Sequence, residues 1–96
     1  MFSLRRIKPD DGRGITGARI ITLIRGEGGA ERDTETQYPT VGWRMLSESF
    51  SHWYITSIIT EIISVEIESF SADTEEDRTT VIFKTLNSTY EFSEYK

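Results

Sequence analysis

Three short runs in the C-terminal third read Val65-Glu-Ile-Glu-Ser69, Thr79-Thr-Val-Ile-Phe-Lys-Thr-Leu86 and Thr89-Tyr-Glu-Phe-Ser93. The first and the last alternate apolar and polar residues, which is typical of a strand with one buried face. Asn87 and Ser88 between the second and third runs suit a tight turn, because asparagine tolerates a positive φ. The runs therefore predict a meander of three antiparallel strands.

The rest of the chain is also rich in residues that favour strands. It contains twelve Ile, twelve Thr and three Val, against four Leu and three Ala. β-Branched side chains lose rotamer freedom in helices and pack well on a pleated surface. An apolar run at residues 18–25 predicts a further strand, and residues 34–38 predict a short one that ends before Pro39.

The predicted fold class is mainly β. We expect a small antiparallel sheet of four to six strands, curled toward a barrel because closure removes exposed edges. One short helical turn is expected near residues 45–50. Residues 55–64 fit two patterns, since isoleucines at 55, 58, 59, 62 and 63 follow a helical stripe whereas nearly all their neighbours are β-branched or serine. We favour a strand there.

The chain has the length of a single domain. Pro9 and three glycines lie among charged residues in the first seventeen positions. We therefore predict a flexible N-terminal arm at residues 1–17 and one β-rich domain at residues 18–96.

Several classes of protein are disfavoured by composition. The chain has no cysteine, which excludes disulfides and thiolate chemistry and fits a reducing cytoplasm. The start lacks the apolar region of a secretion signal, and the longest apolar stretch, at residues 54–67, is interrupted by Thr, Ser and Glu. We expect a cytoplasmic protein that is not embedded in a membrane.

Motifs that could carry catalysis are weak. Gly12, Gly14 and Gly17 match the spacing G-x-G-x-x-G, but they precede a strand, whereas a dinucleotide site needs them between a strand and a helix. His52 is the single histidine, and a catalytic or zinc-binding role would need partners. We predict a protein that is not an enzyme and that uses no cofactor or metal.

Charge is divided unevenly along the chain. Residues 1–48 carry a net charge of +1, residues 49–96 a net charge of −6, and the whole chain −5. An acidic surface can meet a basic partner, where electrostatics mainly set the association rate and specificity. The alternative is that the charge only keeps the domain soluble. The predicted acidic contact residues are Glu66, Glu68, Asp73, Glu75, Glu76 and Asp77.

Aromatic residues gather between positions 38 and 54. Trp, Tyr and Arg most often dominate the binding energy of protein interfaces. We therefore predict Trp43, Arg44 and Trp53 as contact residues, with either tryptophan as the apolar anchor. The alternative, that this segment covers the core, is left open.

Three runs in the chain resemble small β-rich proteins that phages and prophages encode. They are Val41-Gly-Trp-Arg-Met45, Tyr54-Ile-Thr-Ser-Ile-Ile-Thr-Glu-Ile62 and Phe83-Lys-Thr-Leu-Asn-Ser-Thr-Tyr90, about a quarter of the chain, and none is a catalytic signature. The resemblance implies a compact protein that acts by binding, as do inhibitors of bacterial defence systems such as anti-CRISPRs.

Three functions are therefore carried forward. The first is a protein-binding domain of phage type that inhibits a host nucleic-acid-handling defence protein through its acidic surface. The second is a small barrel that binds single-stranded nucleic acid through its aromatic residues and a basic arm containing Arg5, Arg6, Lys8 and Arg13. The third is an assembly component whose edge strands pair between copies. The sequence leaves the oligomeric state open.

Overall fold

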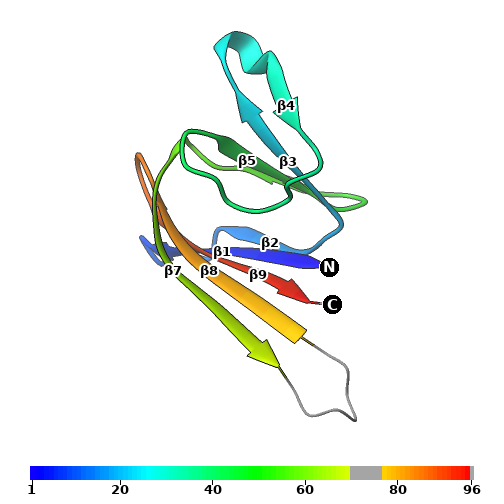
Figure 1. Cartoon of the computed structure of the whole chain (residues 1–96), viewed down its shortest axis with the longest axis vertical. Helices are drawn as coiled ribbons and strands as arrows, with labels where there is room; N and C mark the ends of the chain where they lie inside the picture. Colours follow the sequence, from blue (N-terminus) through cyan, green and yellow to red (C-terminus); the bar gives the residue numbers. More distant parts are fainter. Residues whose placement is uncertain (70–76, 96) are drawn as a thin grey trace.

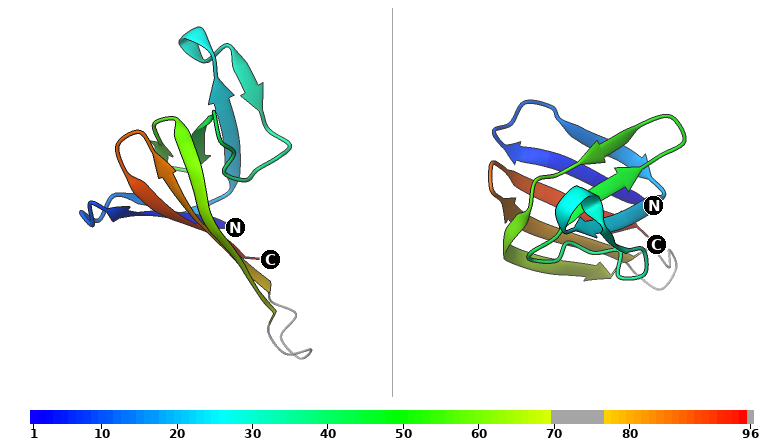
Figure 2. Two further views of the ribbon diagram at one scale, coloured as in Figure 1. Left: turned by 60° about the vertical axis from the view of Figure 1, so that its left-hand side comes forward. Right: turned by 90° about the horizontal axis from the view of Figure 1, so that it is seen from above.

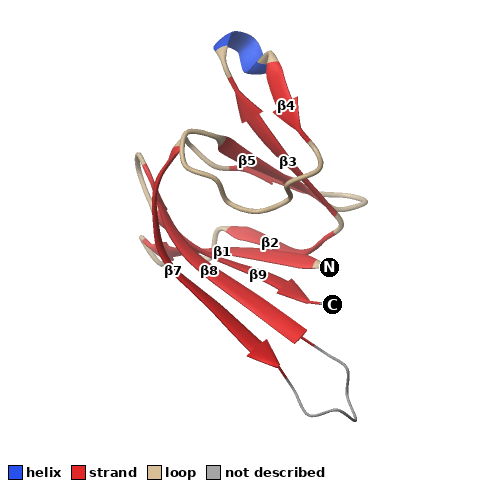
Figure 3. Ribbon diagram, in the orientation of Figure 1, coloured by secondary structure: helices blue, strands red, loops and turns tan. Residues whose placement is uncertain are grey.

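The chain folds into two antiparallel sheets that face each other (Figures 1 and 3). The computed structural model describes residues 1–69 and 77–95. In chain order, the elements are β1 (Phe2–Lys8), β2 (Gly14–Ala18), β3 (Ile20–Arg25), the short 3-10 helix η1 (Glu27–Gly29), β4 (Glu31–Asp33), β5 (Arg44–Glu48), β6 (Trp53–Ile55), β7 (Ile59–Ser69), β8 (Asp77–Thr85) and β9 (Thr89–Tyr95). The larger sheet has the strand order β2-β1-β9-β8-β7, and the smaller sheet the order β4-β3-β5-β6. The inner face of each sheet is the one turned toward the other sheet.

The predicted mainly β, antiparallel fold is confirmed, and the C-terminal meander forms β7, β8 and β9. In the tight connection between β8 and β9, the amide of Thr85 donates to the carbonyl of Ser88 over 2.8 Å. The strands are divided between two sheets instead of curling as one sheet toward a barrel. The reason is that the chain leaves the larger sheet after β2 and returns to it only at β7, so the intervening strands form a second sheet that packs against the first.

The expectation of a flexible N-terminal arm is wrong. β1 lies between β2 and β9 and is hydrogen-bonded to both, and Phe2 and Leu4 on its inner face are buried. Pro9 and Gly12 belong to the connection between β1 and β2. Gly14 begins β2 with a φ of +145°, and a Cβ atom there would lie 2.0 Å from the carbonyl oxygen of Leu4. Because residue 14 is a glycine, β1 and β2 can approach each other closely.

The strand predicted at residues 34–38 is also wrong. The strand in this region is β4, and it ends at Asp33. The carboxylate of Asp33 accepts hydrogen bonds from the amides of Glu35 and Thr36, each over 2.9 Å. Such local bonds to an aspartate favour a turn over a sheet ladder, so the chain bends at this point.

The helical turn expected near residues 45–50 does not form, because residues 44–48 form β5 instead. Met45 and Ser47 point inward and are fully buried, opposite Leu23 and Ile21 of β3. Strand pairing with β3 on one side and β6 on the other satisfies the backbone of this segment.

The strand favoured at residues 55–64 is confirmed for Ile55, which ends β6, and for residues 59–64 of β7, whereas residues 56–58 connect the two strands. The helix-like spacing of the isoleucines has a local cause. Ile59 pairs with Thr85 and Ile62 pairs with Phe83, with one extra residue of β7 between them. This bulge allows two residues three apart to face the same side of a strand.

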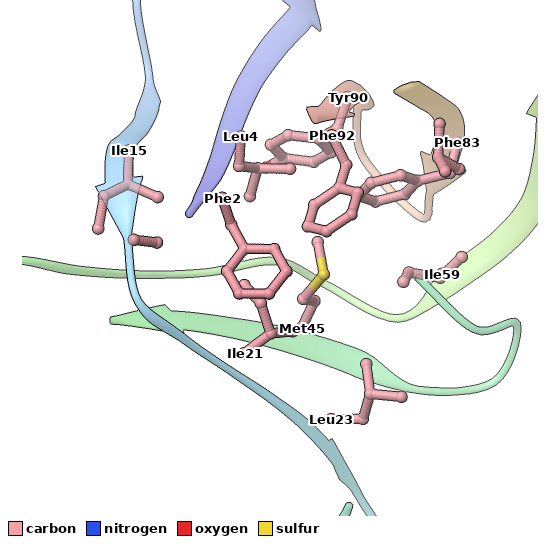
Figure 4. Close-up of a cluster of buried hydrophobic side chains, with 12 residues drawn as sticks. Phe2, Leu4, Ile15, Ile21, Leu23, Met45, Ile59, Phe83, Tyr90 and Phe92 are labelled. Atoms are coloured by element: carbon pink, nitrogen blue, oxygen red, sulfur yellow. The ribbon is translucent and has the colours of Figure 1, made fainter. Parts of the chain in front are cut away.

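The core lies between the two sheets, and four aromatic rings pack there among aliphatic side chains (Figure 4). Phe92 of β9 stacks on Phe2 of β1 with ring centroids 5.7 Å apart, and Phe83 stacks on Tyr90 at 5.4 Å. Met45 reaches them from the smaller sheet. The larger sheet thus contributes rings from both β1 and β9 to the core.

Candidate protein-binding surface

The carboxylates of Glu66 and Glu68 are exposed on the outer face of β7, as the sequence alternation predicted. They pair in register with Thr80 and Arg78 of β8. Neither carboxylate forms an ion pair with another described residue. Both groups are therefore available to a partner on the solvent side of the larger sheet.

The remaining predicted acidic residues are at the connection between β7 and β8. Asp77 is the first residue of β8 and pairs with Ser69, the last residue of β7. Asp73, Glu75 and Glu76 lie outside the described residues.

Two apolar side chains on the opposite face of β7 are exposed, which the sequence did not predict. Val65 and Ile67 pair with Val81 and Thr79, and the burial of Val81 identifies this as the inner face. Even so, the relative accessibility is 58 % for Val65 and 71 % for Ile67. Burial of such side chains would contribute about 25 cal/mol for each Å² removed from water. Their exposure leaves an apolar patch on this face of β7.

Their exposure follows from the length of β7. The strand begins beside residues 42–43, where the amide of Ile59 donates to the carbonyl of Trp43 and the amide of Gly42 donates to the carbonyl of Ile59, each over 2.9 Å. Glu66 lies seven residues further, or about 23 Å along an extended strand. Figure 2 shows these ends of β7 and β8 pointing away from the smaller sheet. We call residues 64–69 with residues 77–82 the projecting ribbon.

Trp53 is the exposed tryptophan. It lies on β6 at the edge of the smaller sheet, and its relative accessibility is 69 %. Trp53 pairs with Glu48 of β5, and Glu48 pairs with Ile20 of β3, so these three side chains share the outer face of the smaller sheet.

Trp43 and Arg44 have different environments from that of Trp53. Trp43 is half-buried against the core, and the guanidinium of Arg25 lies 4.1 Å from the centroid of its ring. Arg44 is exposed, and its Nε atom donates to the carbonyl of Thr56 over 3.0 Å. Of the two predicted anchors, Trp53 is therefore the one open to a partner.

The structure does not bring Trp53 together with the acidic pair. β6 contacts β2, which is one edge of the larger sheet, whereas Glu66 and Glu68 lie on β7 at the other edge. The exposed apolar side chains that neighbour the acidic pair are therefore Val65 and Ile67, and not Trp53.

The basic residues of the N-terminus are largely paired with carboxylates. Arg5 lies 3.3 Å from Glu91, and Arg6 and Arg13 both form ion pairs with Asp11. The hydrogen bond from Arg6 lowers the pKa of Asp11 to about 2. Because these cations already have acidic neighbours, they are poorly suited to release counterions from a phosphate backbone.

Two tyrosines, one on β6 and one on β9, contact each other across the two sheets beside the core. The hydroxyl groups of Tyr54 and Tyr90 lie 2.8 Å apart. Burial, followed by this hydrogen bond, raises the pKa of Tyr54 to about 12. The pair thus joins the two sheets through a contact that needs a protonated phenol.

This contact predicts a loss of stability at alkaline pH. A Tyr54 phenol in the unfolded chain ionises near pH 10, before that of the folded chain. Its contribution is therefore complete below pH 10 and declines as the pH rises toward 12. Tyr54→Phe should show a smaller decline than the parent in urea unfolding over this window. Tyr95→Phe, at the exposed end of β9, is the control, and equal declines for the parent and Tyr54→Phe would contradict the prediction.

The glycine motif and His52 lie in strands and in the connections between them. Gly12, Gly14 and Gly17 lie in the β1–β2 connection and in β2. His52 is exposed, and its amide donates to the hydroxyl of Ser49 in the β5–β6 turn. Within residues 1–69 and 77–95, no group of His, Asp and Glu side chains is arranged to hold a metal ion. The same residues contain no helix that is long and apolar enough to cross a membrane.

Comparison of the chain with protein-family models, curated proteins and solved structures gave no match.

Proposed function

We propose that this chain is a non-enzymatic protein-binding domain that uses its projecting ribbon to hold a basic partner. The observation that carries the proposal is the exposure of Val65 and Ile67 on the inner face of a strand that extends beyond the core. Apolar side chains next to a rim of charge are the usual composition of a protein interface. The ribbon combines both within a few residues.

Charge supports a basic partner. Glu61, Glu66 and Glu68 are exposed on β7, and the half of the chain that contains them carries a net charge of −6. Proteins that handle nucleic acids present basic surfaces of the kind that such a ribbon complements. Inhibition of a bacterial defence protein, which the resemblance to phage proteins implies, is one way in which this contact could act.

The proposal predicts that the double variant Glu66→Gln and Glu68→Gln binds its partner about tenfold more slowly at low salt, because the charges that steer association are lost. The measurement begins with affinity capture from a bacterial lysate, with and without nuclease. The recovered partner is then purified, and its association rate is measured over a range of salt concentrations.

The matched control is Glu27→Gln with Glu35→Gln, which removes the same charge from exposed positions beside the smaller sheet. This control should bind like the parent. Equal rates for both double variants would contradict the acidic-ribbon proposal. Capture of nucleic acid, or of partners that are lost after nuclease treatment, would favour the nucleic-acid-binding alternative instead.

A further inference from the structure

β7 has an open edge over much of its length. It is the last strand of the larger sheet and pairs on one side with β8. On the other side of β7, the backbone of Ile59 is hydrogen-bonded to residues 42–43. Beyond Ile59, β7 forms no further backbone hydrogen bond on that side with the described residues. Every second amide and carbonyl of the following residues is therefore without a backbone partner in the described part of the chain, as in any edge strand.

The part of this edge that could accept another strand is regular. The register of β7 against β8 shifts near Ile59 and again near Ile62, but from Ser64 to Ser69 it runs without interruption. Natural edge strands are usually protected by proline, by an inward-pointing charge or by short length. β7 has eleven residues and no proline, and the inward positions of its regular part hold Val65 and Ile67.

We infer that residues 64–69 of β7 accept an additional strand from the partner, an extended segment in which apolar and basic residues alternate. This inference rests on the proposed function and specifies how the partner is held. A strand laid along β7 places successive side chains on opposite faces. Its apolar residues would lie beside Val65 and Ile67, and its basic residues beside Glu66 and Glu68.

Charge decides between such a segment and a second copy of this chain. Pairing of β7 with β7 of another copy would bring Glu66 and Glu68 of both copies onto one outer face, next to one another. Like charges on neighbouring strands destabilise the pair. A lysine- or arginine-bearing segment instead removes this repulsion, so the edge favours a partner of opposite charge.

The test uses the full chain and a peptide of about six residues in which lysine and valine alternate, the length of the regular edge. Two further peptides carry N-methyl groups on one or the other alternate set of backbone amides. Only the set that faces β7 is needed for strand pairing. We expect one methylated peptide to lose at least about tenfold in affinity and the other to bind like the parent peptide.

Hydrogen exchange of the chain, followed by NMR, locates the contact. Alternate amides between residues 64 and 68 should become protected when the unmethylated peptide binds. Ile67→Lys, which puts a charge on the inner face of the edge, should weaken binding by a similar factor. Ile20→Lys, at an exposed position of the smaller sheet, is the matched control and should bind normally.

The outcomes separate this inference from the proposed function. If both methylated peptides bind alike but Glu66→Gln with Glu68→Gln weakens binding, the ribbon binds through side chains and strand addition is wrong. If the peptide does not bind, strand addition is also wrong, whereas partner capture still tests the ribbon. If the acidic double variant changes neither peptide binding nor capture, both ideas fail. A mass that rises with concentration, and that Ile67→Lys abolishes, would identify a second copy as the occupant and overturn the choice of partner.

Discussion

Deletion of residues 2–8 is expected to abolish cooperative unfolding of the domain. These residues form β1, which is the second strand of the larger sheet and is bonded to β2 and β9. Without β1, both neighbours lose a partner, and Phe2 and Leu4 leave the core. Circular dichroism during heating should show a gradual change instead of a sigmoidal transition.

The control for this deletion is Arg5→Gln, which keeps the strand and removes one exposed ion pair with Glu91. Such pairs contribute at most about 1 kcal/mol, so the cooperative transition should persist. A truncated chain that unfolds as cooperatively as the parent would show that these residues are an appended arm after all.

Phe92→Ala is expected to have the largest effect of any single substitution in the core. The Phe92 side chain is fully buried at the centre of the larger sheet, stacked on Phe2 and in edge contact with Tyr38. Truncation of a buried phenylalanine costs about 3–5 kcal/mol. A domain of this size has about 5–15 kcal/mol of stability in total. The midpoint of thermal unfolding should therefore fall by at least about 12 °C.

Phe50→Ala is the comparison for this prediction. Phe50 lies in the β5–β6 turn with a relative accessibility of 87 %. Among the aromatic and cationic side chains of the described residues, only the guanidinium of Arg19 contacts its ring. Its removal should change stability by less than about 1 kcal/mol. Similar losses for the two alanine variants would mean that the ring of Phe92 is not part of the core.

The C-terminal meander was predictable because its pattern is local. Val81, Phe83, Tyr90 and Phe92 each lie two residues from another inward-facing position, and this period of two is sufficient to define strands and their buried face. The same period placed Glu66 and Glu68 together on one outer face.

The N-terminal strands were missed because their pattern is short and interrupted. β1 has only Phe2 and Leu4 as fully buried apolar residues, and the charged residues that follow suggest solvent. The burial of these two side chains depends on β9, which lies more than eighty residues away in the sequence. A pairing at that separation leaves no local signal.

The candidate surface was only half predictable for a similar reason. Alternation identified Val65 and Ile67 as one face of a strand, and a strand's apolar face is normally covered. Whether it is covered depends on where the smaller sheet ends, which is a property of the assembled structure. The separation of Trp53 from the acidic pair has the same origin, since it depends on which edge of the larger sheet β6 contacts.

The position of β1 beside β9 also has a consequence for synthesis on the ribosome. β1 emerges before the other strands of the domain, but one of its two neighbours is β9, the last of these strands in chain order. Until residues 89–94 are available, β1 can pair only with β2, and an isolated two-stranded hairpin is marginally stable in water. The domain therefore completes its folding after β9 has emerged. A chain arrested before that point leaves Phe2 and Leu4 uncovered, where chaperones or aggregation can reach them.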